Sequence, residues 1–149
     1  MNAAYVHLVL NNVPPVLSLA GLCLLVGGMS ARSEAVTRAA FAVLLVTVLI
    51  AIPTYVAGQD AQRYVNSMVE GVNKAAIEPH QEAATAALIF LSIDGVLATI
   101  ALFTKLRRVV TLFVLVLSVM AMLTVTYAAR LGARIHHPEI EMRTPPPVR

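Results

Sequence analysis

The segment that decides the fold is VVTLFVLVLSVMAMLTVTY, residues 109–127, which contains no charged side chain. A helix needs about 20 mainly apolar residues to cross the roughly 30 Å hydrocarbon core of a bilayer. Three further segments meet this requirement, so the predicted spans are about 5–29, 39–57, 80–103 and 109–131. The sequence therefore predicts an all-α integral membrane four-helix bundle over residues 1–141, followed by an extended proline-rich tail over 142–149.

The amino-acid composition supports a membrane protein, and the residue types and motifs present exclude several classes of function. Of the 149 residues, 58% are hydrophobic and 13% are charged, whereas soluble domains are about 45–50% apolar and about 25% charged. The single cysteine, Cys23, excludes an intrachain disulfide and a paired-thiol metal or redox site. Motifs for a catalytic triad, a phosphate-binding loop or a zinc protease helix are absent from the sequence. An independent enzyme acting on a soluble substrate is therefore the least favoured class.

The distribution of charge predicts the topology. The two short loops carry five basic residues and one acid, a net charge of +4, and the other side of the membrane has a net charge of zero; the loop residues are Arg32, Glu34, Arg38, Lys105, Arg107 and Arg108. Basic loops remain in the cytoplasm, so both termini and residues 59–81 are predicted to be periplasmic, in a bacterial inner membrane. The basic residues thus reflect topology, and no nucleic-acid partner is expected.

Prolines and the spacing of apolar residues predict local features in addition to the four spans. Pro14 and Pro15 predict a kink or a break early in the first span. Pro79 suits the first position of the third helix. Residues 59–81 have apolar side chains at helical spacing, which indicates an amphipathic periplasmic segment lying along the membrane surface.

All four histidines fall on the predicted outer side: His7, His80, His136 and His137. Two neutral imidazoles from different helices are a common axial pair for haem b, and with a carboxylate they equally suit copper or zinc. The candidate ligands of haem iron or another metal are His7, His80 and His137. Auxiliary residues that could orient them are Asn11, Asn12, Glu78, Glu82, His136 and Glu139. The simpler interpretation is a solvated helix start for the two glutamates of the third span and an exposed tail after the fourth.

Asp94 lies in the middle of the third span, where a carboxylate facing lipid costs several kcal/mol. Its carboxyl must therefore face protein or water, or carry a proton. Fourteen residues separate it from His80, which places both on nearly one helical stripe together with Ala84, Ala87 and Leu91. A protonated carboxyl bonded to Thr47, Ser118, Ser18 or a carbonyl is one interpretation; a proton relay or a quinone contact is the other.

Several motifs resemble a known family. They are HLVLNNVP from His7, AIPTYVAG from Ala51 with Ala61 and Gln62, IEPHQEAA from Ile77, and GARIHHPEI from Gly132. The set resembles a bacterial family of small four-span membrane proteins related to the DUF2231 group, over most of residues 5–141. The family pattern has histidine at Asn12 and arginine at His136, so His137 corresponds to the family histidine. The resemblance implies a companion of respiratory or cytochrome systems.

These observations lead to three functional hypotheses. The first is a membrane subunit of a respiratory or photosynthetic electron-transfer assembly that binds haem b through outer-side histidines, with other membrane subunits or a periplasmic cytochrome as partners. The second is a non-catalytic structural or assembly subunit of a membrane complex. The third is copper or zinc binding at the same outer cluster of histidines.

Overall fold

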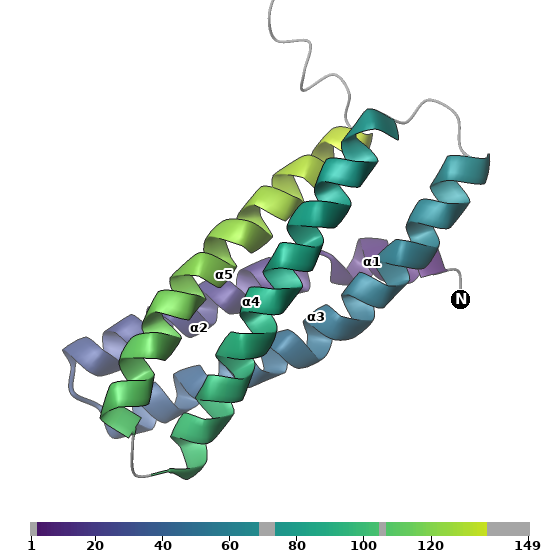
Figure 1. Cartoon of the computed structure of the whole chain (residues 1–149). Coiled ribbons are helices and arrows are strands. Elements are labelled where there is room, and N and C mark those ends of the chain that lie inside the picture. Colours follow the sequence, from purple (N-terminus) through teal and green to yellow (C-terminus); the bar gives the residue numbers. More distant parts are fainter. Residues whose placement is uncertain (1–2, 69–73, 105–106, 137–149) are drawn as a thin grey trace, which may run out of the picture.

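The computed structural model describes residues 3–68, 74–104 and 107–136, and all regular structure in them is helical. The elements are α1 (Ala3–Leu10), α2 (Val13–Ser30), α3 (Glu34–Met68), the short 3-10 turn η1 (Lys74–Ala76), α4 (Ile77–Phe103) and α5 (Arg107–His136). Together α1 and α2 form one span, and α3, α4 and α5 form the other three (Figure 1). The predicted all-α four-helix bundle is confirmed. His137, Glu139 and the 142–149 tail lie outside the described residues.

The chain is a multi-pass membrane protein in a lipid bilayer. Four helical stretches are long and apolar enough to cross a membrane, namely Tyr5–Ser30, Glu34–Val65, Lys74–Phe103 and Val109–Ile135. Large apolar side chains cover the outside of the bundle, as shown by the exposed fractions of Phe103 (83%), Val116 (63%) and Leu123 (61%). Lipid tails are the surroundings in which such a surface is stable. Which membrane it is, and which side each terminus occupies, stay predictions.

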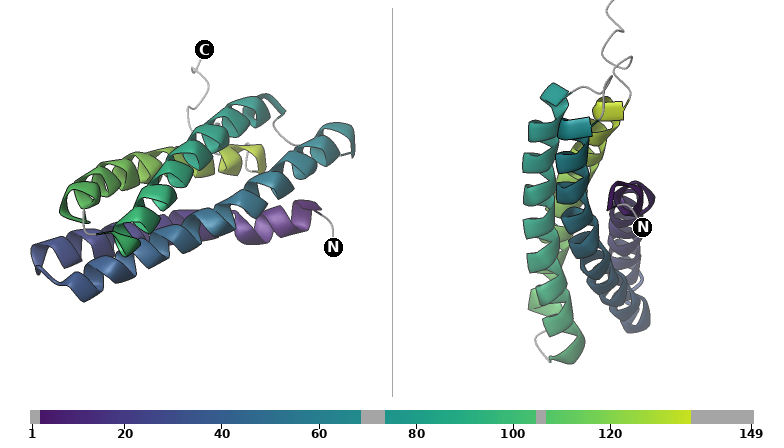
Figure 2. Two further views of the ribbon diagram at one scale, coloured as in Figure 1. Left: turned by 60° about the horizontal axis from the view of Figure 1, so that its bottom comes forward. Right: turned by 90° about the vertical axis from the view of Figure 1, so that its right-hand side faces the viewer.

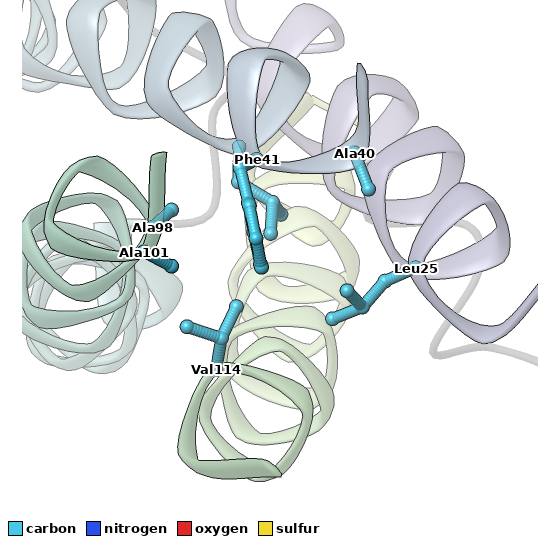
Figure 3. Close-up of a cluster of buried hydrophobic side chains, with 7 residues drawn as sticks. Leu25, Ala40, Phe41, Ala98, Ala101 and Val114 are labelled. Carbon is cyan, nitrogen blue, oxygen red and sulfur yellow. The ribbon is translucent and has the colours of Figure 1, made fainter. Parts of the chain in front are cut away.

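A cluster of buried apolar side chains joins all four spans. Its members are Leu25, Ala40, Phe41, Leu44, Ala98, Ala101 and Val114. Figure 3 shows the ring of Phe41 between α2, α4 and α5, with two alanines of α4 beside it. Helices in lipid associate through close packing rather than through a hydrophobic driving force, and small residues permit that approach. The cluster fixes the relative position of the helices, and so of the residues further along them.

The turn between α2 and α3 is closed by backbone hydrogen bonds. Arg32 has φ 52°, a left-handed conformation, and this lets the Ser33 amide donate to the Gly28 carbonyl at 2.9 Å. The hydroxyl of Ser33 then accepts from the Val36 amide at 3.4 Å, which caps α3. The end of α2, the start of α3, the end of α4 and the start of α5 lie at one end of the bundle. The N-terminal helix, the start of α4 and the end of α5 lie towards the other (Figures 1 and 2).

The predicted break in the first span is confirmed. A turn at Asn11 and Asn12 separates α1 from α2. Pro14 and Pro15 lack the amide hydrogens that would otherwise bond the carbonyls of Leu10 and Asn11. The hydrogen-bond pattern of the α-helix is therefore interrupted at this point. The break allows α1 to take its own direction across α3.

The second span is longer than predicted, because α3 continues through Pro53 as far as Met68. Transmembrane helices tolerate proline where neighbouring elements stabilise the freed backbone. Residues 59–68, expected to belong to a separate surface segment, are therefore the end of α3. Val65 packs there against the buried Ile77 and Ile135, so part of the predicted apolar face covers the bundle. Its position along a membrane surface stays a prediction. Since α4 begins at Ile77, Pro79 is its third residue.

The two glycines at the end of α2 predict opposite effects of the same substitution. A Cβ at Gly28 would lie 2.7 Å from the backbone nitrogen of Thr37, whereas a Cβ at Gly27 would have no atom within 4 Å. Gly28→Ala should therefore separate α2 from α3 and lower the free energy of unfolding by about 1–3 kcal/mol. Gly27→Ala should be neutral or stabilising, by up to about 1 kcal/mol, because alanine favours helix. Thermal unfolding in mild detergent measures both variants, and equal midpoints would contradict the packing at Gly28.

Candidate cofactor site

His7 lies on α1 and bonds to the backbone of α3. Its Nδ1 is 3.0 Å from the carbonyl oxygen of Thr54. A carbonyl only accepts hydrogen bonds, so Nδ1 is the donor, and in a neutral ring the lone pair is then on Nε2. Gly58 lies four residues after Thr54, and a Cβ there would be 2.9 Å from the Nδ1 and Cε1 atoms of the ring. The imidazole reaches the carbonyl because this position has no side chain.

His80 has the same arrangement on the other pair of helices. Its Nδ1, on α4, is 2.8 Å from the carbonyl oxygen of Ala128 on α5. Gly132 follows Ala128 by four residues, and a Cβ there would be 3.1 Å from Cε1 of the ring. Each histidine therefore turns its Nδ1–Cε1 edge towards a glycine, and each ring is fixed in the tautomer that places the Nε2 lone pair away from that helix.

The structure brings the two rings together. The centroids of the His7 and His80 imidazoles are 6.4 Å apart, and the ring planes form an angle of 74°. The first lies on the first span and the second on the third, so these two predicted candidate ligands do meet, while their position on the outer side stays a prediction. A hydrogen bond from the second ring nitrogen to a carbonyl is the usual support of a metal-binding histidine, because it fixes the orientation and the basicity of the ring.

Both histidines line a cavity of about 460 Å³. Its wall is mostly apolar and is built by α1, α3, α4, α5 and the start of α2. Deep in the cavity are Ala51, Leu91 and Val125, which belong to a buried apolar cluster. Ligand and cofactor sites are commonly concave, mostly apolar cavities of about 300–1,000 Å³ with few polar groups. The polar groups of this wall include the two imidazoles and the side chains of Asn11, Tyr55 and Gln81.

The sequence did not reveal the hydrogen-bond chain beside His80. The Thr85 hydroxyl donates to the Gln81 carbonyl at 2.8 Å, so the Tyr55 hydroxyl, 2.9 Å away, is the donor to Thr85. The Gln81 side-chain amide donates to the same tyrosine oxygen at 3.1 Å. This chain ties α3 to α4 next to the cavity. The spacing from histidine to glycine, 51 residues from His7 to Gly58 and 52 from His80 to Gly132, is a sequence signal that could have revealed the glycines.

The predicted auxiliary residues take different places. Asn11 and Asn12 both line the cavity, and Oδ1 of Asn11 is buried without a hydrogen-bond partner among the described residues. Glu78 and Glu82 are exposed and lie outside the cavity wall. His136 is the last residue of α5. His137 and Glu139 lie outside the described residues, so their roles as ligand and auxiliary group stay predictions.

Asp94 is buried in the bundle, with 1% of its surface exposed. Of the partners that the sequence suggested, Ser118 donates to Asp94 Oδ2 at 2.7 Å. The predicted stripe towards His80 is confirmed, because Ala84, Ala87 and Leu91 all line the cavity. The other carboxyl oxygen, Oδ1, has no hydrogen-bond partner among the described residues. The carboxyl is thus held by one hydroxyl and faces protein rather than lipid.

Fold and site together define a multi-pass membrane protein with a histidine-lined cavity in its four-helix bundle. No protein-family model, curated protein or solved structure matches this chain. Its function is therefore argued from the geometry of the cavity.

The glycines beside the histidines predict a graded response to alanine. Gly58→Ala should push the His7 ring from the Thr54 carbonyl, because its contact of 2.9 Å is closer than carbon atoms tolerate. Gly132→Ala should displace His80 less, since its contact is 3.1 Å. Losing one such hydrogen bond should cost about 1 kcal/mol of stability. Nitrogen NMR of the labelled imidazoles measures the Nδ1 hydrogen bond directly, with Gly27→Ala as the control; an unchanged Nδ1 signal in Gly58→Ala would contradict this geometry.

Proposed function

We propose that this protein binds haem b between His7 and His80 and serves as an electron-transfer subunit on the outer side of a bacterial inner membrane. The supporting observation is the pair of imidazoles on different spans, 6.4 Å apart between centroids, each with its Nδ1 hydrogen bonded to a backbone carbonyl. The bound haem would supply one-electron exchange between ferric and ferrous iron.

The distance between the rings supports one iron atom bound by both. Metal–imidazole bonds are about 2 Å long. Two such bonds plus the halves of two five-membered rings place the centroids of a linear pair roughly 6 Å apart. The tautomer supports the same conclusion, because both rings donate through Nδ1 and keep Nε2 as the nitrogen that can bind iron.

The number of ligands favours haem over a bare metal ion. The described residues contain no group of three or more histidine, cysteine, aspartate or glutamate side chains able to hold a metal. Structural and catalytic zinc sites use three or four protein ligands, whereas haem brings four porphyrin nitrogens and needs two axial ligands at most. The two imidazoles are therefore sufficient for haem, whereas a typical zinc site would need further ligands from outside the described residues. The apolar wall of the cavity suits a porphyrin, which packs well on aliphatic side chains.

The membrane side and the respiratory or photosynthetic setting in this proposal are supported by the amino-acid sequence. The basic short loops favour a periplasmic position for the end that holds His7 and His80. The motifs from residues 5 to 141 favour a relationship to the DUF2231 group and, through it, a respiratory or photosynthetic setting. A periplasmic cytochrome or another membrane subunit would then be the electron partner.

The absorption spectrum of protein produced with excess haem tests the proposal. The wild type should show a Soret band and the split visible bands of low-spin haem with two imidazole ligands, at one haem per chain. His7→Ala and His80→Ala should each lose the low-spin spectrum, because one axial ligand is missing. His137→Ala is the matched control and should keep it, since the proposed pair does not include that residue.

Three results would overturn the assignment. Folded wild-type protein without a Soret band would show that no haem binds. A low-spin spectrum retained by His80→Ala would place the ligands elsewhere. Elemental analysis that detects stoichiometric copper or zinc, lost in His80→Ala, would replace haem by a bare metal ion.

A further inference from the structure

A layer of buried polar side chains crosses the centre of the bundle, and the haem proposal does not use it. Each of the four spans contributes one member: Ser18 from α2, Thr47 from α3, Asp94 from α4 and Ser118 from α5. All four are at most 2% exposed. Polar groups at such a depth in a membrane protein are costly and commonly mark a pathway for ions or protons. We call these four residues the central polar layer.

On three spans the central polar layer lies one helical turn from residues of the cavity wall. Three residues that line the cavity each precede or follow a layer residue by one helical turn: Pro14 is four residues from Ser18, Ala51 is four from Thr47, and Leu91 is three from Asp94. One turn is about 5.4 Å along a helix. The cavity wall thus comes within about one turn of a layer residue on three of the four spans, and on α4 that residue is Asp94.

Two atoms of the layer have unused hydrogen-bonding capacity. Asp94 Oδ1 and the Ser18 hydroxyl have no hydrogen-bond partner among the described residues. The Thr47 hydroxyl donates to the Val43 carbonyl of its own helix at 2.8 Å, and its oxygen can still accept. A buried polar atom without a partner costs about 1–3 kcal/mol, so these atoms indicate a site that exchanges a small polar species rather than a closed structural network.

The ionisable groups near Asp94 indicate which small polar species its carboxyl binds. Asp94 is the only ionisable residue among the buried side chains that the structure describes. The groups that α2, α3 and α5 contribute to the layer are all neutral hydroxyls. The ionisable groups on the cavity wall are the His7 and His80 imidazoles and the Tyr55 phenol. With no buried cation to balance a carboxylate, a proton is the species that neutralises it in an apolar interior.

We propose that the Asp94 carboxyl is a proton-binding site that exchanges with the outer aqueous side through the cavity. A hydronium ion in the cavity becomes water by releasing a proton, which crosses the one helical turn between Leu91 and Asp94 and binds Oδ1; the reverse step returns the proton to water. The Ser118 hydroxyl keeps its bond to Oδ2 and holds the carboxyl in place. This proposal does not depend on haem.

Infrared spectroscopy of the full chain in lipid nanodiscs tests the proposal. The spectrum should contain a carboxylic acid C=O band that is absent in Asp94→Asn, and the band should shift within the mixing time on transfer to D2O. Ala87→Phe fills the cavity between His80 and Leu91 and should slow the shift several-fold. Val96→Phe, on the same helix at a position that is 60% exposed, is the matched control and should leave the rate unchanged.

Three outcomes of this experiment would overturn the proposal. A spectrum without a band lost in Asp94→Asn would mean that Asp94 holds no proton. A band that shifts only over hours in the wild type would show a sealed carboxyl without a route. A fast shift that Ala87→Phe does not slow would place the route elsewhere. If Ala87→Phe fails the thermal unfolding test, Ala87→Val fills less of the cavity and should still slow the exchange relative to Val96→Phe.

Discussion

A polar group inside a lipid bilayer has to find its hydrogen-bond partner within the protein, and this constraint determines the arrangement of the site. His7 and His80 meet it by bonding to backbone carbonyls of neighbouring helices. Such a carbonyl already accepts from the amide four residues later, and here that residue is Gly58 or Gly132. Without a side chain on the glycine, the imidazole reaches the carbonyl from the side and shares it. The bond therefore fixes three things together: the tautomer, the ring orientation and the distance between helices.

The same device occurs once in each half of the chain. From histidine to carbonyl the separation is 47 residues in the first half and 48 in the second. In each half the histidine is near the start of one span and the glycine near the end of the next span, so each half is a helical hairpin that presents one imidazole. Two similar hairpins packed side by side place their imidazoles opposite each other. A site shared between halves follows from this arrangement, and neither hairpin can form it alone.

Much of the fold was predictable from the sequence, and less of the site. Apolar runs and charge determine the four spans, and Pro14 and Pro15 determine the break after α1, because these are local effects. The predicted end of the second span near residue 57 was wrong, since α3 continues to Met68 and its Val65 packs on the bundle. That His7 and His80 lie at one end of the bundle was predictable from their positions at the starts of the first and third spans. Which two of the four histidines meet depends on the rotation of each helix, and this is decided by glycine contacts and by the Tyr55–Gln81 bond, which span periodicity does not encode.

The order of groups along the bundle connects its two polar sites. From the end of the bundle that holds His7 and His80 inward come the imidazole pair, the apolar wall residues Ala51 and Leu91, and then the carboxyl held by Ser118. If the imidazole pair holds haem as proposed, an electron arriving there would add negative charge to a medium of low dielectric constant, where charge interacts strongly over several ångströms. A proton taken up one helical turn beyond Leu91 would compensate that charge. The two sites would be close enough to interact, so one bundle would combine an electron site with a proton site and need no charged residue between them.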